Sequence, residues 1–510
     1  MPYKILDCTL RDGGYYTNWD FDNEIVESYI EAMNILPIDY IEIGYRNKPS
    51  KGYMGEYGYS PISVLSKLRN KCHKKIGIML NEKSTQPEDL DNLLSPVSHL
   101  IDFVRIAVDP KNFKRAILLA KEIKKKGVMV GFNVMYMSKW GEYEDFIKNL
   151  NMVNGVVDIF CMVDSFGGIM PDEVRSLTRK VKSELTCMIG FHGHNNLQMG
   201  LINTLAALEE GCDIVDATIL GMGRGAGNLN MELLLSFLNR DGVNVNFNAL
   251  SNVVSAFQPL LEKHKWGTTL PYMISGANSI PQKEVMEWVC NRAYSLDSIV
   301  RALDNKKNNV EDNARFPIWK PDTVEEVLII GGGPSVLEHK NAIREFLINN
   351  SNTTLIFATA RHASLFEDLK NKKVYCLVGS EGRRLERVIS HDKFNDVVVL
   401  PPYPRKLGTE VPIFAHNNAF ELEDVTFTNR YYDSCTTACL MAALEIKADR
   451  TFIVGYDGYR GQVLSEKEMG LTTENRILFE AYSNFVNKPL ISLTPTLYKG
   501  LQMQSIYQYI

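Results

Sequence analysis

The feature that most limits the fold of this chain is one unit that recurs along its first 220 residues. Each unit consists of a short apolar run, a turn and an amphipathic stretch typical of a helix. Apolar runs that alternate with helices predict parallel strands buried on both faces. The runs are Ile5–Leu10, Tyr40–Tyr45, Lys75–Leu80, Phe103–Val108, Val128–Tyr136, Val157–Val163, Met188–His194 and Ile214–Leu220. Eight such units favour a closed (β/α)8 TIM barrel over an open doubly wound sheet.

The rest of the chain changes character twice. After a barrel over residues 1–244, residues 245–303 carry helical patterns and predict a helical extension. Residues 304–323 are polar, contain two prolines and predict a linker. Residues 324–510 begin with a strand, a glycine turn and a helix, which predicts a second, Rossmann-like open α/β domain.

Composition excludes several classes of function. The chain has 56 Lys and Arg against 61 Asp and Glu, so it lacks the basic surface that nucleic acid requires. No apolar stretch approaches the ~20 residues that span a bilayer, and the start of the chain does not have the pattern of a secretory leader. Nine scattered cysteines without a CxxC pair are typical of a reducing compartment. We therefore expect a cytoplasmic protein that binds neither nucleic acid nor membrane.

Polar residues at the ends of the predicted strands are the candidate catalytic groups, because barrel enzymes place their chemistry there. His192 and His194 are two residues apart on one strand, so both imidazoles face the same side. In a closed barrel the first and seventh strands flank the eighth, which brings Asp12 towards the two histidines. Two imidazoles and one carboxylate leave coordination positions open, as a catalytic divalent metal requires. A pair of hydrogen-bonded histidines is the structural alternative.

Further polar residues are expected near this site. Arg11 places a cation beside Asp12 that suits a developing enolate, or forms a salt bridge across the barrel mouth. For Glu42, Arg105 and Asp164, two interpretations are open. Each either forms buried ion pairs and orients neighbouring groups, or acts directly in catalysis or substrate binding. We assign Glu42 as a candidate catalytic residue, and the predicted substrate-binding residues are Arg105, Asn133 and Asp164.

Three motifs in order resemble the DRE-TIM metallolyase family over residues 3–240. They are LRDG at 10–13, HGHNN at 192–196 and GMGRGAGN at 221–228. The family includes 4-hydroxy-2-oxovalerate aldolase, 3-hydroxy-3-methylglutaryl-CoA lyase, and the isopropylmalate and homocitrate synthases. The resemblance implies Mn²⁺ or Mg²⁺, with Zn²⁺ less favoured, and assigns enolate stabilisation to Arg11. The metal ligands that it implies are Asp12, His192, His194 and Asn228.

Two departures from the family pattern bear on the reaction. The glycine loop lacks the cysteine of the acyl-CoA lyases, which weakens that activity. Tyr15 stands where the aldolase branch has a histidine base, and an unperturbed tyrosine pKa of ~10 makes a poor base near neutrality. Either Tyr15 works beside the metal and Arg11, or another group moves the proton. In PYMISG at 271–276, which also looks aldolase-like, Tyr272 reaches the site or packs beside it.

The resemblance favours a metal-dependent aldolase that makes or breaks a carbon–carbon bond between a pyruvate enolate and an aldehyde. A Claisen-type synthase acting on acyl-CoA and a 2-oxo acid is one alternative. A barrel with a mainly regulatory or ligand-binding role is another. The helical extension is a plausible dimer surface, so we expect a homo-oligomer.

In the second domain, Gly331, Gly332, Gly333 and Ser335 follow a predicted strand and open a helix. Glycines that allow close approach and free amides at a helix start can hold phosphate. Ser335 and Glu338 have the spacing of a capping box. Together with IVGYDGY at 453–459, which contains Asp457, this turn resembles sialyltransferase-related and nucleotide-sugar domains. The resemblance implies a nucleotide or a nucleotide-sugar ligand.

Overall fold

The computed structural model describes residues 3–290, 296–310, 315–391, 394–405, 409–459 and 466–510. The chain divides into two compact units, Met1–Glu287 and Trp288–Ile510. The predicted helical extension and linker include residues 291–295 and 311–314, which lie outside the described residues. The domain bounds drawn from the sequence stay predictions.

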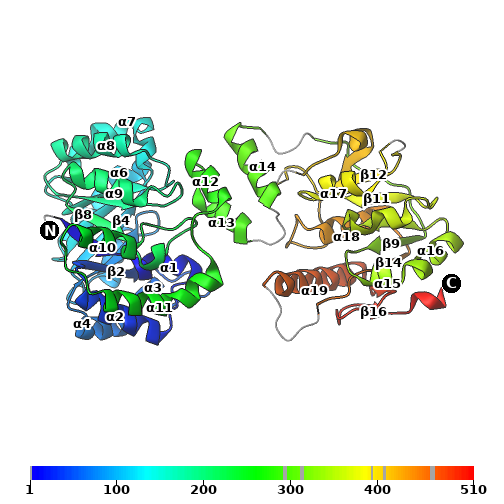
Figure 1. Cartoon of the computed structure of the whole chain (residues 1–510), viewed down its shortest axis with the longest axis horizontal. Helices are drawn as coiled ribbons and strands as arrows, with labels where there is room; N and C mark the ends of the chain where they lie inside the picture. Colours follow the sequence, from blue (N-terminus) through cyan, green and yellow to red (C-terminus); the bar gives the residue numbers. More distant parts are fainter. Residues whose placement is uncertain (1–2, 291–295, 311–314, 392–393, 406–408, 460–465) are drawn as a thin grey trace. The chain divides into compact units, whose positions relative to one another are not determined.

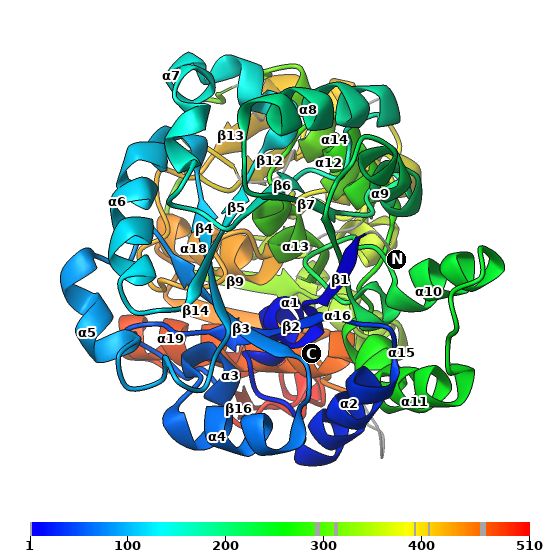
Figure 2. The ribbon, with the colours of Figure 1, turned by 90° about the vertical axis from the view of Figure 1, so that its left-hand side faces the viewer.

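The first unit is a closed barrel of eight parallel strands, which confirms the predicted (β/α)8 fold. Each strand pairs with the next, and the last pairs with the first through Leu6 and Asp216. The outer helices surround the strands (Figure 2). The strands are β1 (Lys4–Asp7), β2 (Tyr40–Tyr45), β3 (Lys75–Asn81), β4 (Phe103–Val108), β5 (Met129–Val134), β6 (Ile159–Asp164), β7 (Met188–Gly193) and β8 (Ile214–Ala217).

The first strand is shorter than the apolar run Ile5–Leu10 suggested. It ends at Asp7, and helix α1 (Thr9–Thr17) begins two residues later. The Asp7 carboxylate accepts hydrogen bonds from the backbone N–H of Thr9 at 2.8 Å and from the Tyr29 hydroxyl at 2.6 Å. The first of these bonds satisfies a free amide at the start of the helix, so the chain turns there. Arg11 and Asp12 therefore lie on the first helix and not on the strand.

Alternation along the strands builds the barrel interior in layers. A small apolar cluster, separate from the main core, consists of Leu6, Cys8, Tyr40, Phe103, Ile159 and Ile214. Two residues further along several strands the interior becomes charged, with Glu42, Arg105 and Asp216 all buried. Intervening residues such as Ile5 and Ile41 face the helices and belong to the main core. The polar layer lies towards the carboxyl ends of the strands, where barrel sites form.

Helices α11 and α12 of the first unit follow the last barrel helix, and α13 spans the boundary between the two units. The longest, α11, packs against α2, where the rings of Phe257 and Tyr29 lie 6.2 Å apart. The outer helices are α2 (Asn23–Ile35), α4 (Ile62–Lys71), α6 (Phe113–Lys124), α8 (Pro171–Glu184), α9 (Gly200–Glu209) and α10 (Met231–Arg240). They are followed by α11 (Phe247–His264), α12 (Leu270–Ala277) and α13 (Gln282–Cys290).

The second unit contains an open, parallel, eight-stranded sheet (Figure 1). Its order is β13-β12-β11-β10-β9-β14-β15-β16, so the winding direction reverses between β9 and β14. The strands are β9 (Glu326–Ile330), β10 (Thr354–Phe357), β11 (Lys373–Cys376), β12 (Val397–Leu400), β13 (Ala419–Glu421), β14 (Arg450–Val454), β15 (Ile491–Ser492) and β16 (Gln502–Met503). The last two and β13 are too short to stand out in the sequence.

Both faces of this sheet are covered. Val327 and Ile329 of β9 pack in one core with α18 (Cys435–Ile446) and α19 (Glu466–Val486). Leu328 and Ile330 pack in another core with α16 (Lys340–Asn349). Burial on both faces explains why these strands are continuously apolar. The remaining helices here are α14 (Leu296–Lys307), α15 (Ser335–Glu338) and α17 (Glu381–Val388). In the described part of the chain, no helix is both long and apolar enough to cross a bilayer.

Candidate active site

Asp12 and the two histidines converge at the carboxyl end of the barrel. The Nε2 atom of His192 lies 3.7 Å from Asp12 Oδ2, and the rings of His192 and His194 lie 5.1 Å apart. All three side chains are buried. Asp12 comes from the start of α1, whereas the histidines come from β7 and the residue after it. The barrel thus brings together donors that are 180 positions apart in the chain.

Each imidazole is oriented through its other nitrogen. His192 Nδ1 lies 2.9 Å from Asp216 Oδ2, and His194 Nδ1 lies 3.2 Å from the carbonyl oxygen of Ser165. With Nδ1 donating to these oxygens, each Nε2 keeps a lone pair for a metal. Burial, and next the neighbouring His192, lower the pKa of His194 to about 3. His194 is therefore neutral at physiological pH, which is the form that ligates metal.

Asn228 supplies a further oxygen beside the same carboxylate. Its Nδ2 donates to Asp12 Oδ2 at 2.7 Å, and its buried Oδ1 has no hydrogen-bond partner among the described residues. Burial raises the pKa of Asp12, but Arg11 and the two histidines lower it overall, so the group is a carboxylate. An anionic oxygen, two imidazoles and an unpaired amide oxygen are a donor set that suits a divalent metal ion. The residues present fit a divalent cation.

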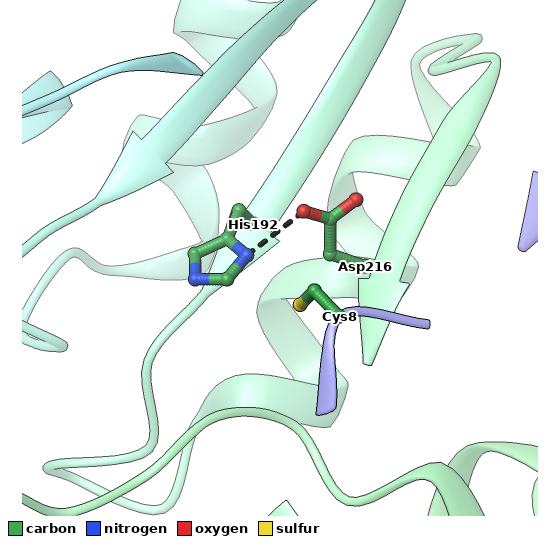
Figure 3. A group of neighbouring side chains, drawn as sticks. All are labelled: Cys8, His192 and Asp216. Atoms are coloured by element: carbon green, nitrogen blue, oxygen red, sulfur yellow. Dashed lines mark hydrogen bonds and ion pairs between the residues drawn. The ribbon is translucent and has the colours of Figure 1, made fainter. Parts of the chain in front are cut away.

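A second group of potential ligands consists of Cys8, Asp216 and the same His192 (Figure 3). Asp216 is already engaged, because its Oδ2 accepts from Arg105 at 2.7 Å as well as from His192. Burial raises the pKa of the Cys8 thiol, which disfavours the thiolate that a metal would need. We therefore interpret Asp216 as the group that orients His192 and not as a metal ligand. The sequence analysis missed it, although an acidic residue inside the buried run Ile214–Leu220 was a signal.

Arg11 is held by a chain of buried charges. Its Nε donates to Glu42 Oε1 at 2.5 Å, and Arg105 Nε donates to Glu42 Oε2 at 2.5 Å. Arg11 also pairs with Asp12. Arg105 continues the chain to Asp216. Buried ions need such partners, because an unpaired charge is costly in the interior. The Nη2 of Arg11 remains without a partner in the described structure and can receive an oxyanion.

This network changes the interpretation of two predicted residues. Both carboxylate oxygens of Glu42 are occupied by arginines, so Glu42 is placed to position Arg11 and not to move a proton. Arg105 is 1% exposed and bonded to Glu42 and Asp216, so it lies within the ion network and is not placed as a substrate contact. The structure favours the orienting alternative for both.

Asn133 and Asp164 have different surroundings. Asn133 is buried on β5, and its Oδ1 has no partner in the described part of the chain. Asp164 ends β6, and its Oδ1 accepts the N–H of Gly167 at 3.0 Å. Burial raises the pKa of Asp164 to about 6 despite the backbone amides around it. This contact gives Asp164 a role in the turn after β6. Substrate binding by either residue stays a prediction.

Tyr15 lies on α1 in an aromatic setting. Its hydroxyl is 2.8 Å from that of Tyr45, and its ring packs edge-on against Trp19. The guanidinium of Arg224, from the glycine loop, lies 4.4 Å from the centre of the Tyr15 ring. Tyr272 is buried on α12 and its backbone oxygen accepts from Asn196. A Cβ added to Gly225 would lie 3.0 Å from the Tyr272 ring, so Tyr272 packs against the glycine loop.

The glycine turn of the second unit is built differently from the expected capping box. Helix α15 begins at Ser335, whose N–H donates to Asp457 Oδ2 at 2.9 Å and whose hydroxyl also bonds to Asp457. Glu338 takes no part in capping this helix. A Cβ at Gly331 would lie 2.5 Å from the Gly455 oxygen, and one at Gly333 would lie 2.7 Å from Asp457 Cγ. Packing against the turn after β14 therefore requires these two glycines.

Comparisons with known proteins identify relatives of the barrel. The HMGL-like family matches residues 95–256. A 4-hydroxy-2-oxovalerate aldolase of Thermomicrobium roseum is 32% identical over 251 residues, which cover 48% of this chain and 68% of the relative. An oxaloacetate decarboxylase of Mycobacterium tuberculosis is 29% identical over 247 residues, covering 47% of this chain and 70% of the relative.

A solved structure covers a larger share of the chain than these relatives do. It is the N-terminal domain of a candidate aldolase from Bacteroides vulgatus, with 63% identity and a TM-score of 0.56. The match covers 59% of this chain and 99% of that domain. The family match, residues 95–256, lies within the first unit and includes His192 and His194. The chain belongs to the HMGL-like family of DRE-TIM metallolyases.

Proposed function

We propose that the barrel is a divalent-metal-dependent aldolase that makes or breaks a carbon–carbon bond between a pyruvate enolate and an aldehyde. The observation that carries the proposal is the convergence of Asp12, His192 and His194, with the Asn228 oxygen unpaired beside them. A bound Mn²⁺ or Mg²⁺ would polarise the keto group of the 2-oxo acid. The aldolase names of several relatives support the proposal.

In this reaction Arg11 stabilises the enolate. The bond that breaks in the cleavage direction leaves its electron pair on the 2-oxo acid fragment, where the charge moves to oxygen. Arg11 is fixed by Glu42 and Asp12, so its unpaired Nη2 needs no reorganisation as this charge develops. Such preorganised donors contribute most when water is excluded.

Tyr15 is the candidate that exchanges the proton of the substrate hydroxyl. Replacing it by Phe keeps the ring but removes the hydroxyl, and we expect carbon–carbon cleavage to fall by about 10²–10⁴-fold. Tyr45→Phe is the matched control, because it removes only the hydrogen-bond partner of Tyr15. Equal losses in the two variants would exclude Tyr15 as the proton-transfer group.

The decisive test is exchange of the pyruvate methyl protons with deuterated solvent in the presence of Mn²⁺, followed by NMR. We expect exchange in the wild type and its loss in Asp12→Asn. Absence of exchange with every divalent metal would refute the proposal. Similarity to an oxaloacetate decarboxylase supports a second reaction through the same enolate. Oxaloacetate consumption without aldehyde would select decarboxylation, and CoA release from acyl-CoA would select the Claisen alternative.

For the second unit we propose a phosphate-bearing ligand such as a nucleotide or a nucleotide-sugar. A cavity of about 790 Å³ lies at the carboxyl edge where β9 and β14 adjoin. Ligands of open α/β sheets bind where the winding direction reverses. Gly332 and Asp457 line it, as does Arg361, whose Nη1 donates to the Gly332 oxygen at 2.9 Å.

Calorimetry of the full chain with ATP, CMP and UDP-N-acetylglucosamine tests this ligand class. Arg361→Gln is expected to weaken the bound nucleotide about tenfold or more. Arg450→Gln is the control, because Arg450 lies at the amino end of β14, away from the carboxyl ends that line the cavity, and pairs with Glu325. If none of the three nucleotides binds, the proposed nucleotide or nucleotide-sugar ligand is refuted.

A further inference from the structure

The glycine loop after β8 holds one arginine at the mouth of the barrel. The loop is anchored just after Arg224: the Gly225 oxygen accepts from the Gly267 N–H at 3.1 Å, and the Gly227 oxygen accepts from the Asn195 N–H at 2.9 Å. Gly225 and Gly227 have φ of +62° and +79°, a conformation that favours glycine. The position of Arg224 is therefore set by the backbone on its carboxyl side.

Arg224 differs from most arginines of the first unit in its partners. The others form ion pairs with carboxylates, as Arg11, Arg105 and Arg115 do, or donate to several carbonyl oxygens, as Arg46 does. Within the described part of the chain, the side chain of Arg224 forms neither an ion pair nor a hydrogen bond, whereas its backbone oxygen accepts from Gly227 at 3.1 Å. Its recorded contact is the face of the Tyr15 ring, 4.4 Å away. A half-buried guanidinium without an anion can accept one from outside.

Arg224 lies close to the proposed metal site. Tyr15 lies on the helix that carries Asp12, and Asn228 lies at the end of the same loop as Arg224. Tyr15 raises the pKa of Arg224 most, burial lowers it, and Asp12 raises it further, so this guanidinium lies close enough to Asp12 to interact with it electrostatically. Arg11 is already adjacent to Asp12. Arg224 is thus a second cation that the enolate chemistry does not use.

We propose that Arg224 binds an acidic group on the acceptor aldehyde, so that the substrate is an anionic aldehyde bearing a carboxylate or a phosphate. The inference rests on the proposed aldolase function. A guanidinium binds either oxyanion in a bidentate manner, and the Tyr15 ring holds its plane in place. The reacting carbonyl of the acceptor would then lie between Arg224 and the enolate that Arg11 stabilises.

The experiment compares aldehydes in condensation with pyruvate and Mn²⁺. Acetaldehyde and propanal are the neutral probes, glyoxylate and succinic semialdehyde carry a carboxylate, and glyceraldehyde 3-phosphate carries a phosphate. We expect the wild type to have a higher kcat/KM for one anionic class. Arg224→Gln should lower that kcat/KM by about 10–100-fold, mainly through KM, and change the neutral aldehydes less than about threefold. Arg224→Lys should restore part of the loss.

Arg240→Gln is the matched control, because Arg240 also lies over a ring, that of Phe237 at 4.3 Å, but pairs with Asp241, the residue after α10. Equal loss with neutral and anionic aldehydes would overturn the proposal and indicate that Arg224 acts through Tyr15. A wild-type preference for neutral aldehydes would overturn it as well. Methyl exchange of pyruvate separates the two hypotheses: without exchange the aldolase proposal fails, whereas exchange without anion preference refutes only the role of Arg224.

Discussion

Arg11 and Glu42 illustrate how single side chains divide the work of this site. Glu42 is fully buried and accepts from the guanidinium groups of Arg11 and Arg105, so it aligns Arg11. At the other end of the same network, Asp216 aligns His192. Removing a member of such a network leaves a buried charge unpaired, with a cost of about 3–5 kcal/mol. Conservative replacements are therefore the informative ones.

Arg11→Lys keeps the positive charge next to Glu42 but loses the forked donors. We expect kcat for pyruvate methyl exchange to fall by about 10²–10³-fold, because a preorganised oxyanion donor is lost. NMR measures the exchange rate, and thermal unfolding checks that the variant folds. A change of less than threefold in a folded variant would contradict the role of Arg11.

Asp7 provides a test of stability against pH. Burial raises its pKa from 3.8 to about 6, although Tyr29 and Thr9 donate to it. Because the folded state holds this proton more tightly, its contribution to stability is complete below pH ~4 and is lost as the pH rises through about 6. We expect the free energy of unfolding from this group to fall by about 3 kcal/mol over that window.

Urea unfolding of the wild type and Asp7→Asn from pH 4 to pH 7 measures this contribution. Asn can still accept from the Thr9 N–H and the Tyr29 hydroxyl through Oδ1, so the variant removes mainly the titration. Asp164 titrates with the same sign, and part of the pH dependence should remain. Identical slopes for the two proteins would rule out the raised pKa of Asp7.

At the scale of elements, helix α1 is the part that sets the geometry of the site. It carries Arg11, Asp12 and Tyr15, and the Trp19 indole N–H donates to the Arg11 oxygen at 2.9 Å. A Cβ added to Gly14 would lie 2.1 Å from the Trp19 ring. The helix therefore approaches this tryptophan too closely for any side chain at Gly14.

Gly14→Ala is expected to shift α1 and to weaken Mn²⁺ binding about tenfold, together with ~1–3 kcal/mol of lost stability from overpacking. Gly141→Ala is the control, since no atom lies within 4 Å of the added Cβ. Titration with Mn²⁺ followed by calorimetry provides the comparison. Unchanged affinity in Gly14→Ala would mean that α1 tolerates the displacement.

At the scale of the whole molecule, each unit has its own hydrophobic core. A homologous N-terminal domain, 63% identical and covered over 99% of its length, has been crystallised alone. We therefore expect a fragment of residues 1–303 to fold and to exchange pyruvate methyl protons within about threefold of the full chain. A loss of more than tenfold in a folded fragment would show that the second unit contributes to the barrel site.

Local patterns were enough to predict the barrel, which the structure confirms, and to single out its candidate metal donors. A strand that is buried on both faces appears in the sequence as a short run of apolar residues. The motifs that contain Asp12, His192 and Asn228 are likewise at most eight residues long, so each can be recognised locally. The partners of those donors were not predictable in the same way. Arg105 and Asp216 are 111 residues apart, and Arg224 is more than 200 residues from Tyr15. Such pairs meet only because eight strands close into a ring, which places the first and last elements side by side. Closure of the barrel also places Asp216 beside His192 and leaves the Arg224 side chain next to Tyr15 without a carboxylate partner.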